Sequence, residues 1–139
     1  TLVCSEAYAQ KNGLEPIARI KSIAVSGCKP ETMGLGPIFA SRKALDRAEL
    51  SADAIDVVEI NEAFATQSIA SVRDLGLNID KVNIDGGAIA IGHPLGATGA
   101  RITGKAAQIL KREDGRYALS TQCIGGGQGI ATVMETVGV

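Results

Sequence analysis

The stretch that decides the fold class spans residues 55–76 and reads IDVVEINEAFATQSIASVRDLG. Its first six residues are mostly apolar and β-branched, which is typical of a buried strand. Asn61 then stands where a helix N-cap is expected, and Gly76 stands where a helix C-terminus is expected. Between them the spacing predicts a helix with three inward apolar side chains: Ala65, Ile69 and Val72. A strand leading directly into a helix is the repeating unit of α/β proteins.

The same alternation of strands and helices continues in both directions from this unit. Further helices are predicted over residues 5–12, from Pro37 to about residue 48, and from Thr98 to about Arg112. Extended segments are predicted at residues 2–4, 16–27, 55–60, 82–84, 117–123 and 130–137. The last two strands are joined only by a short glycine-rich connection, so we expect them to pair antiparallel. The predicted fold is therefore α/β, a mixed β-sheet layered with helices.

Composition bounds the class of protein. The 139 residues suffice for one domain with its own core. The 17 glycines and the low aromatic content of 3% indicate closely approaching backbones rather than a core of large rings. The formal net charge of −1 lacks the basic bias of a nucleic-acid-binding protein, so no nucleic-acid partner is expected. No apolar run reaches the roughly 18 residues of a membrane span, so no membrane partner is expected either.

Cysteine usage and the first residues indicate the compartment. Cys4, Cys28 and Cys123 are odd in number and widely spaced, which favours free thiols in a reducing compartment over a disulfide scaffold. No signal peptide is recognisable, and a cytoplasmic location is the expectation. The chain opens on an apolar run, residues 1–4, without an initiator methionine. We expect sequence upstream of it, where a segment addressing the protein to an organellar matrix could also have stood.

Two motifs place polar groups at expected strand ends or loops. The first is Asn61-Glu62-Ala63-Phe64-Ala65, in which Asn61 is either a simple helix cap or an amide aimed into a cleft at the carboxyl edge of the sheet. The second is the glycine-rich loop of residues 85–97, which holds His93, the single histidine, between Gly92 and Pro94. A lone histidine is often structural or simply exposed. One held by such a loop is also a candidate for proton transfer near neutral pH.

The third motif is Cys123-Ile124-Gly125-Gly126-Gly127-Gln128-Gly129, at the end of an expected strand. A cysteine there is either a small core residue or a functional thiol. The successive glycines leave their N–H groups unshielded, and such groups can form an oxyanion hole. A thiol, one histidine and one amide make an acyl-transfer set without a metal, and the absence of a Cys-x-x-Cys pair argues against zinc. No metal and no cofactor are therefore expected.

Taken together and in this order, the three motifs resemble those of the C-terminal half of the thiolases, the acetyl-CoA acetyltransferases and 3-ketoacyl-CoA thiolases. The resemblance covers essentially the whole chain, including Gly34-Leu35-Gly36-Pro37 and the strand before Asn61. Thr98 stands where many thiolases carry serine and keeps the hydroxyl. The resemblance implies one thiolase-like C-terminal domain over residues 1–139. It also implies an acyltransferase that works on CoA thioesters, by Claisen condensation or by thiolysis of 3-ketoacyl-CoA.

The resemblance also implies a role for each site residue. His93 would deprotonate the nucleophilic thiol, and Cys123 would remove the α-proton of bound acetyl-CoA. His93 and a water held by Asn61 would bind the enolate oxygen, while the Gly125 N–H would help to bind the other oxyanion. The implied substrate-binding residues, which would line the pantetheine channel, are Ala63 and Phe64.

The nucleophile itself is not recognisable in this chain, because neither Cys4 nor Cys28 matches the family's nucleophile motif. We therefore expect an N-terminal thiolase half as partner, a homodimer or homotetramer when complete, and no activity from the chain alone. Two alternatives remain. A non-enzymatic module that binds CoA esters would not need both His93 and Cys123. A ketoacyl synthase would normally use two histidines, or histidine and asparagine.

Overall fold

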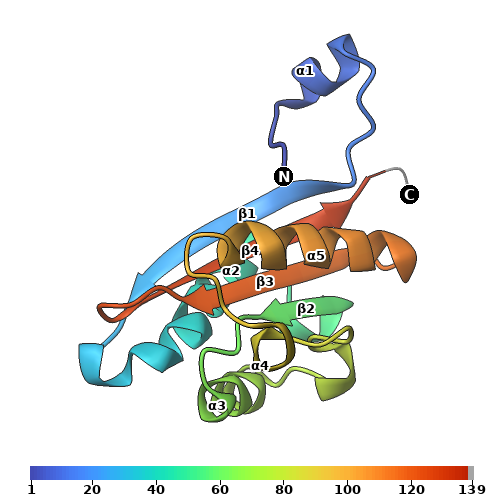
Figure 1. Ribbon diagram of the computed structural model, residues 1–139. Helices are drawn as coiled ribbons and strands as arrows, with labels where there is room; N and C mark the ends of the chain where they lie inside the picture. The colour runs from blue at the N-terminus through green and yellow to red at the C-terminus, as the bar shows by residue number, and fades with distance from the viewer. Residues whose placement is uncertain (138–139) are drawn as a thin grey trace.

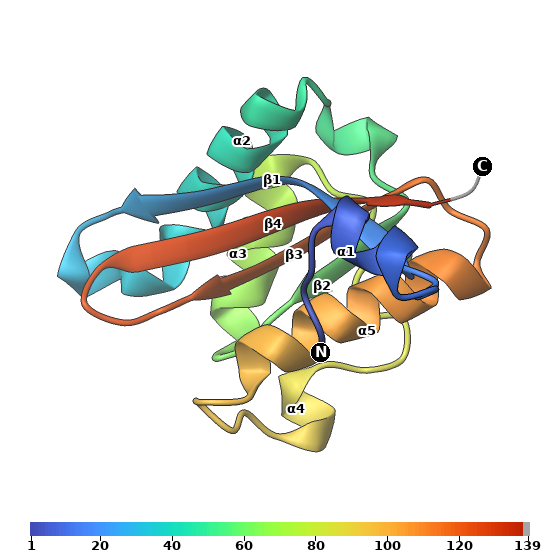
Figure 2. The same ribbon diagram turned by 90° about the horizontal axis from the view of Figure 1, so that it is seen from above.

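The computed structural model describes residues 1–137, which form a mixed β-sheet of four strands with helices on both faces (Figure 1). The strands are β1 (Ala18–Gly27), β2 (Val57–Ile60), β3 (Tyr117–Cys123) and β4 (Gln128–Thr136). Their order across the sheet is β1-β4-β3-β2, which is visible from above in Figure 2. β2 and β3 run parallel, whereas β4 is antiparallel to both β3 and β1. The predicted α/β fold with a mixed sheet is confirmed.

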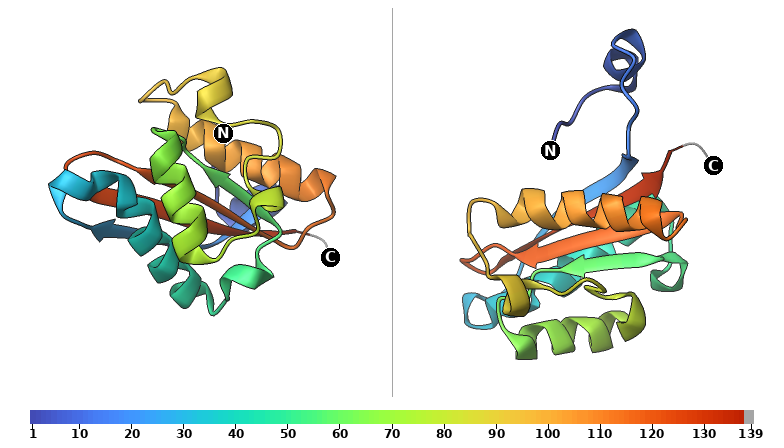
Figure 3. Two further views of the ribbon diagram at one scale, coloured as in Figure 1. Left: turned by 90° about the horizontal axis from the view of Figure 1, so that it is seen from below. Right: turned by 45° about the vertical axis from the view of Figure 1, so that its right-hand side comes forward.

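Helices cover the two faces of the sheet unequally (Figure 3). α5 (Thr98–Arg112) lies on one face, and α2 (Gly36–Ala48) and α3 (Ala65–Leu75) lie on the other. As predicted, α5 buries four apolar side chains: Ile102, Ala106, Ile109 and Leu110. α2 buries the four predicted at its own positions: Ala40, Ala44, Leu45 and Ala48. Each face therefore has its own apolar cluster, one under α5 and a larger one under α2 and α3.

A glycine pair lets α2 approach the sheet at backbone contact. A Cβ added to Gly129 in β4 would overlap the backbone of Gly36, and a Cβ added to Gly36 would overlap the backbone of Gln128. Only glycine fits at both positions, because any side chain would push the first turn of α2 off β4. The close backbone approach expected from the glycine-rich composition is thus present at the α2–β4 contact.

The N-terminal segment stands clear of the layers (Figure 1). α1 (Glu6–Lys11) confirms the helix predicted over residues 5–12. Its N-cap is Ser5, whose hydroxyl accepts a hydrogen bond from the Tyr8 N–H, and Gly13 follows it at φ +62°. The strand expected at residues 2–4 is wrong. Leu2 and Val3 are exposed, and no strand within residues 1–137 pairs with them. Without a neighbouring strand, no ladder hydrogen bonds hold the backbone of these residues in strand geometry.

The prediction for α3 was partly wrong. The helix begins at Ala65, with Phe64 at the N-cap, so Asn61 does not cap it. Its inward stripe is Gln67, Ser71 and Leu75, spaced four residues apart, together with Val72. Of the three residues predicted to face inward, only Val72 does. Ala65 is exposed, and Ile69 lies on the opposite side and is 49% exposed. The apolar pattern misled because two of the inward positions are polar. The predicted end at Gly76 is confirmed, with φ +67°.

Short elements complete the fold. The glycine-rich loop contains one helical turn, α4 (Ala88–Ile91), and the expected extended piece at 82–84 is reduced to a single bridge between Val82 and Val58. Three 3-10 turns were not predicted: η1 (Pro30–Leu35), η2 (Ala52–Ala54) and η3 (Ile79–Lys81). Within residues 1–137, no helix combines the length and apolar character needed to cross a membrane.

Candidate active site

The candidate site lies where the two parallel strands end. Ile60 of β2 pairs with Thr121 of β3, and the Asn61 N–H donates to the Thr121 carbonyl oxygen over 3.0 Å. Cys123 is the last residue of β3, two positions beyond Thr121. The carboxyl ends of β2 and β3 therefore meet at one edge of the sheet, where α/β proteins typically bind ligands. Asn61 and Cys123 both belong to this edge.

His93 reaches the same edge from the glycine-rich loop. Its Nε2 lies 3.3 Å from Asn61 Nδ2, and its Nδ1 lies 2.7 Å from Thr98 Oγ1. Thr98 Oγ1 also donates its hydrogen to the Pro94 carbonyl oxygen at 3.0 Å. The hydroxyl has only one hydrogen, so it must accept from His93 Nδ1–H. Nε2 is then the unprotonated nitrogen of the neutral ring, and it accepts from the Asn61 amide.

Backbone conformation turns His93 toward Asn61. α4 ends at Gly92, whose φ of +87° suits glycine, and His93 follows directly. Thr98, the first residue of α5, is fully buried and holds the other side of the ring. Sequence reasoning noted Thr98 only as a substitute for serine. Its contact with the ring makes it part of the site, and a hydroxyl five positions after the histidine was the available signal.

Cys123 is 8% exposed, and burial is the main cause that raises the pKa of its thiol above the ordinary value. The nearby Cys28 adds to the rise, while a hydrogen bond from the Cys123 backbone N–H opposes it. The protonated thiol is therefore the resting form near neutral pH, and it can donate a proton. Reaction as a base requires the thiolate.

The turn after Cys123 depends on glycine. Gly125, Gly126 and Gly127 have φ values of +74°, +62° and +84°, a left-handed region that other residues adopt at a cost. The Gly127 carbonyl accepts a hydrogen bond from the Cys28 N–H over 2.7 Å, which ties this turn to the end of β1. Gly125 itself is exposed, so its backbone is open to a ligand.

The remaining predicted residues follow Asn61 at the same edge. Ala63 is half-buried, and Phe64 is 59% exposed, which is unusual for a large apolar side chain. The structure therefore brings Asn61 and His93 into direct contact. It places Cys123 at the end of the adjacent strand, and Gly125, Ala63 and Phe64 in the segments that follow Cys123 and Asn61.

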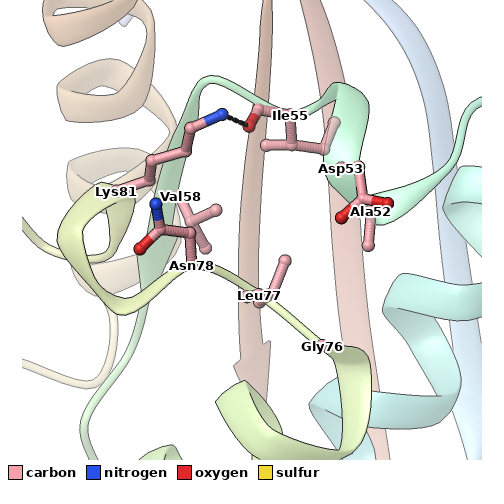
Figure 4. Close-up of a pocket in the computed structure, with 8 residues that line it drawn as sticks. All are labelled: Ala52, Asp53, Ile55, Val58, Gly76, Leu77, Asn78 and Lys81. Carbon is pink, nitrogen blue, oxygen red and sulfur yellow. Dashed lines mark hydrogen bonds between the residues drawn. The ribbon is translucent and has the colours of Figure 1, made fainter.

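Two cavities lie outside this constellation. One, of about 290 Å³, opens beside the start of β2, where Lys81 Nζ donates to the Ile55 carbonyl oxygen over 2.8 Å (Figure 4). Its lining residues are Ala52, Asp53, Ile55, Val58, Gly76, Leu77, Asn78 and Lys81. The other, of about 180 Å³, lies between α5 and strands β3 and β4, and its lining includes Gly99 and Gln122. Neither is lined by His93 or Cys123.

Comparison with known proteins assigns the family. The family model described as "Thiolase, C-terminal domain" matches residues 14–136. The 3-ketoacyl-CoA thiolase of Salmonella typhimurium is 55% identical over 98% of this chain and 36% of its own length, and that of Marinomonas sp. is 52% identical over the same shares. The chain therefore spans about a third of the length of the curated relatives it matches.

Solved structures agree with these sequence matches. Human mitochondrial 3-ketoacyl-CoA thiolase, in a structure in complex with CoA, superposes with a TM-score of 0.94 at 49% identity, over 97% of this chain and 34% of that one. The Bacillus anthracis acetyl-CoA acetyltransferase superposes with a TM-score of 0.92 at 43% identity, over 96% of this chain and 34% of that one.

Proposed function

This chain belongs to the thiolase C-terminal domain family, and we propose that it supplies the acid–base and oxyanion-binding groups of an acyl-CoA acyltransferase. The proposed reaction is acyl transfer between CoA thioesters. It runs as thiolysis of 3-ketoacyl-CoA in one direction and as Claisen condensation in the other. Residues 1–139 act in this proposal as one C-terminal domain. The bacterial relatives favour the cytoplasm as its compartment. The assembled enzyme in this proposal is a homodimer or homotetramer.

The observation that carries the proposal is the hydrogen bonding of His93. Because Thr98 accepts from Nδ1–H, the lone pair of Nε2 is directed toward Asn61 at the sheet edge. A thiol placed there can transfer its proton to Nε2, and the resulting thiolate attacks the thioester carbonyl. The imidazolium then returns the proton to the departing CoA thiolate. Nδ1–H keeps its bond to Thr98 throughout, so the ring does not need to turn.

Cys123 carries out the second proton transfer in the proposal. Its thiolate removes the α-proton of a bound acetyl group, and its thiol returns that proton during thiolysis. The raised pKa suits the donating direction. The negative charge that develops on the enolate oxygen meets His93 Nε2–H and a water held by Asn61. The Gly125 N–H meets the oxyanion of the acyl-transfer step.

The nucleophilic thiol is proposed to come from a partner segment, an N-terminal thiolase half. Cys4 lies in an exposed N-terminal segment. Cys28 follows β1, which lies at the opposite side of the sheet from β2, the strand that leads to Asn61. The human mitochondrial relative was solved with CoA, and CoA thioester is the proposed substrate here, with Ala63 and Phe64 lining its pantetheine channel. The proposed chemistry requires no metal ion and no cofactor besides this substrate.

A chimera tests the proposal. This chain would replace the matching segment of the Salmonella typhimurium 3-ketoacyl-CoA thiolase, and thiolysis and condensation would be measured alongside acyl-enzyme trapping with labelled acyl-CoA. We expect the chimera to be active. Cys123→Ala should still form acyl-enzyme while condensation falls by roughly 10²–10⁴, the usual contribution of a general base. His93→Ala should impair both steps, and Asn61→Ala should lose roughly 10²–10³ as a lost oxyanion donor does.

Cys28→Ala is the matched control, because it removes a thiol near the same glycine turn without touching the proposed proton path. It should retain both half-reactions. An inactive but folded chimera would contradict the proposed function. Condensation at the unmodified rate in Cys123→Ala would contradict the proposed role of that thiol.

A further inference from the structure

The carboxylate of Glu62 binds two residues that lie 21 and 27 positions further along the chain. Its Oε1 accepts from Asn83 Nδ2 over 2.8 Å, and its Oε2 accepts from the Ile89 N–H over 2.9 Å. Ile89 is in the first turn of α4, whose N-cap residue is Gly87 and therefore has no side chain with which to cap the helix. Glu62 thus satisfies a backbone donor at the start of α4 that the local sequence leaves without a partner.

Gly87 is shaped around this carboxylate. A Cβ on Gly87 would overlap the carboxyl group of Glu62 and crowd the side-chain amide of Asn83. Gly87 is also buried and has an extended backbone, so positive φ does not explain the glycine. The space that a side chain would fill is the space that Glu62 occupies.

Asn83 fixes the other oxygen of Glu62 to the sheet. Its Oδ1 accepts from the Ile60 N–H over 2.8 Å, and its Nδ2 donates to the Ile60 carbonyl oxygen over 2.9 Å. Its own N–H donates to the Val58 carbonyl over 2.8 Å. The buried Asn83 side chain therefore satisfies the backbone N–H and C=O of Ile60 at the edge of β2, as a neighbouring strand would. The remaining hydrogen of its side-chain amide is donated to Glu62.

These contacts close a ring around the proposed proton-transfer site. Glu62 is bonded covalently to Asn61, and it holds Ile89 by a hydrogen bond. From Ile89, α4 runs to Gly92, whose N–H bonds back to the Ala88 carbonyl over 2.8 Å, and His93 is next. His93 Nε2 then returns to Asn61 Nδ2. The hydrogen bond between Glu62 and Ile89 therefore helps to set the distance between His93 and Asn61, together with the contact of Thr98 on the other side of the ring.

We propose that Glu62 is a positioning residue for His93: its carboxylate fixes α4, and through α4 it holds the imidazole against Asn61 and Thr98. The effect of Glu62 on catalysis rests on the proposed function, whereas the hydrogen bonds through which it positions His93 do not depend on that function. Both neighbours of the carboxylate are donors, so both of its oxygens must accept. Glutamine has one acceptor and one NH₂ group, so Glu62→Gln must set a donor against either Asn83 or Ile89.

The test uses the chain itself, because His93 is its single histidine and gives one set of ring ¹⁵N signals. In Glu62→Gln, we expect hydrogen exchange of the Ile89 amide to accelerate roughly 10- to 100-fold, the consequence of losing a charge-assisted bond. The ring ¹⁵N shifts should move from a single Nδ1–H tautomer to a mixture of both. Amides of β3 and β4 should exchange as before, which separates lost positioning from a general loss of stability.

A second variant guards against an uninformative outcome. Gly87→Ala should displace the same carboxylate and give the same two changes. Glu135→Gln, which alters another partly buried carboxylate, and Gly96→Ala, at a loop glycine where a Cβ would meet nothing, should leave the Ile89 exchange rate unchanged. If Ile89 exchange and the His93 tautomer stay as they are in both Glu62→Gln and Gly87→Ala, the proposal is overturned.

The kinetic consequence is tested separately in the chimera. There, Glu62→Gln should lower kcat about 10- to 100-fold, in the range seen when a residue that orients a functional histidine is lost. KM should stay nearly constant, because the Glu62 carboxylate bonds to Asn83 and Ile89, neither of which is a proposed substrate-binding residue. An inactive parent chimera together with the expected NMR changes would refute the proposed function and support the positioning role. An active parent chimera together with unchanged NMR signals in the variants would support the proposed function and refute the positioning role.

Discussion

Glu59 offers a quantitative test of how the core responds to pH. It lies in β2, two residues after Val57, which packs in the cluster under α5, so its side chain points to the same face. It is 1% exposed, and Oε1 has no hydrogen-bond partner among residues 1–137. Burial raises the pKa of this carboxyl from 4.5 to about 7, although Arg101 and Lys105 oppose the rise. We predict that Glu59→Gln stabilises the chain at alkaline pH but not at acidic pH.

The magnitude and sign follow from proton linkage. Below the unfolded-state pKa of 4.5, both the folded and the unfolded carboxyl are protonated, and glutamine is nearly equivalent to the acid. Between pH 4.5 and about 7, the unfolded carboxyl releases its proton while the folded one keeps it, so the folded state loses stability with rising pH until its own carboxyl ionises. The rise of the Glu59 pKa from 4.5 to about 7 corresponds to a loss of roughly 3 kcal/mol in the free energy of unfolding. The free energy of unfolding of Glu59→Gln should therefore exceed that of the unmodified chain by up to about 3 kcal/mol at high pH.

Urea unfolding at about pH 4 and about pH 8.5 measures this difference, because the first lies below the unfolded-state pKa and the second above the folded-state pKa. The variant's midpoint should rise by about 1–2 M relative to the unmodified chain at the higher pH only. Glu15→Gln is the matched control, since it removes an exposed carboxylate and should change little at either pH. A difference between Glu59→Gln and the unmodified chain that is the same at both pH values would refute the reasoning.

Three further predictions concern packing, thiol reactivity and the histidine's hydroxyl partner. Gly129→Ala should destabilise the chain by about 3 kcal/mol in urea unfolding, as overpacking against a backbone does, whereas Gly96→Ala, in open space, should be nearly neutral. With iodoacetamide at neutral pH, mass spectrometry should show Cys4 modified at least about 10-fold faster than Cys123, because the thiolate is the reactive form. Equal rates would contradict the burial argument. In the chimera, Thr98→Val should reduce activity about 10- to 100-fold while Thr98→Ser retains it; equal activity of the two would contradict the hydroxyl's role.

The sequence alone predicted those features that depend on local pattern. The inward residues of α5 recur at helical spacing with charged residues between them, so Ile102 and Ile109 could be placed correctly. The antiparallel β3–β4 pair followed from its short connection. Asn61 and His93 could be nominated together because each stands at an expected strand end or glycine loop.

The features that were missed depend on contacts across the fold. Glu62 was noted only as a member of the Asn61 motif, and only the folded chain shows that it binds Asn83 and Ile89, which are 21 and 27 positions away. Gly87 was one glycine among several, and its neighbour is not apparent from the sequence. The inward residues of α3 were predicted wrongly for a related reason. The side of α3 that is buried in the fold is partly polar, and hydrophobic periodicity cannot reveal such a side.

The order of strands in the sheet has a consequence for synthesis of the chain. β1 leaves the ribosome before β2, β3 and β4, and within residues 1–137 its only ladder partner is β4, the last of the four. Ala18 pairs with Thr136, so more than a hundred residues must emerge before this pair can form. Such distant pairing slows folding, and it leaves the apolar β1 open to other unpaired strands in the meantime. Translation that halts before Gln128 leaves β1 without the one ladder partner that it has among residues 1–137.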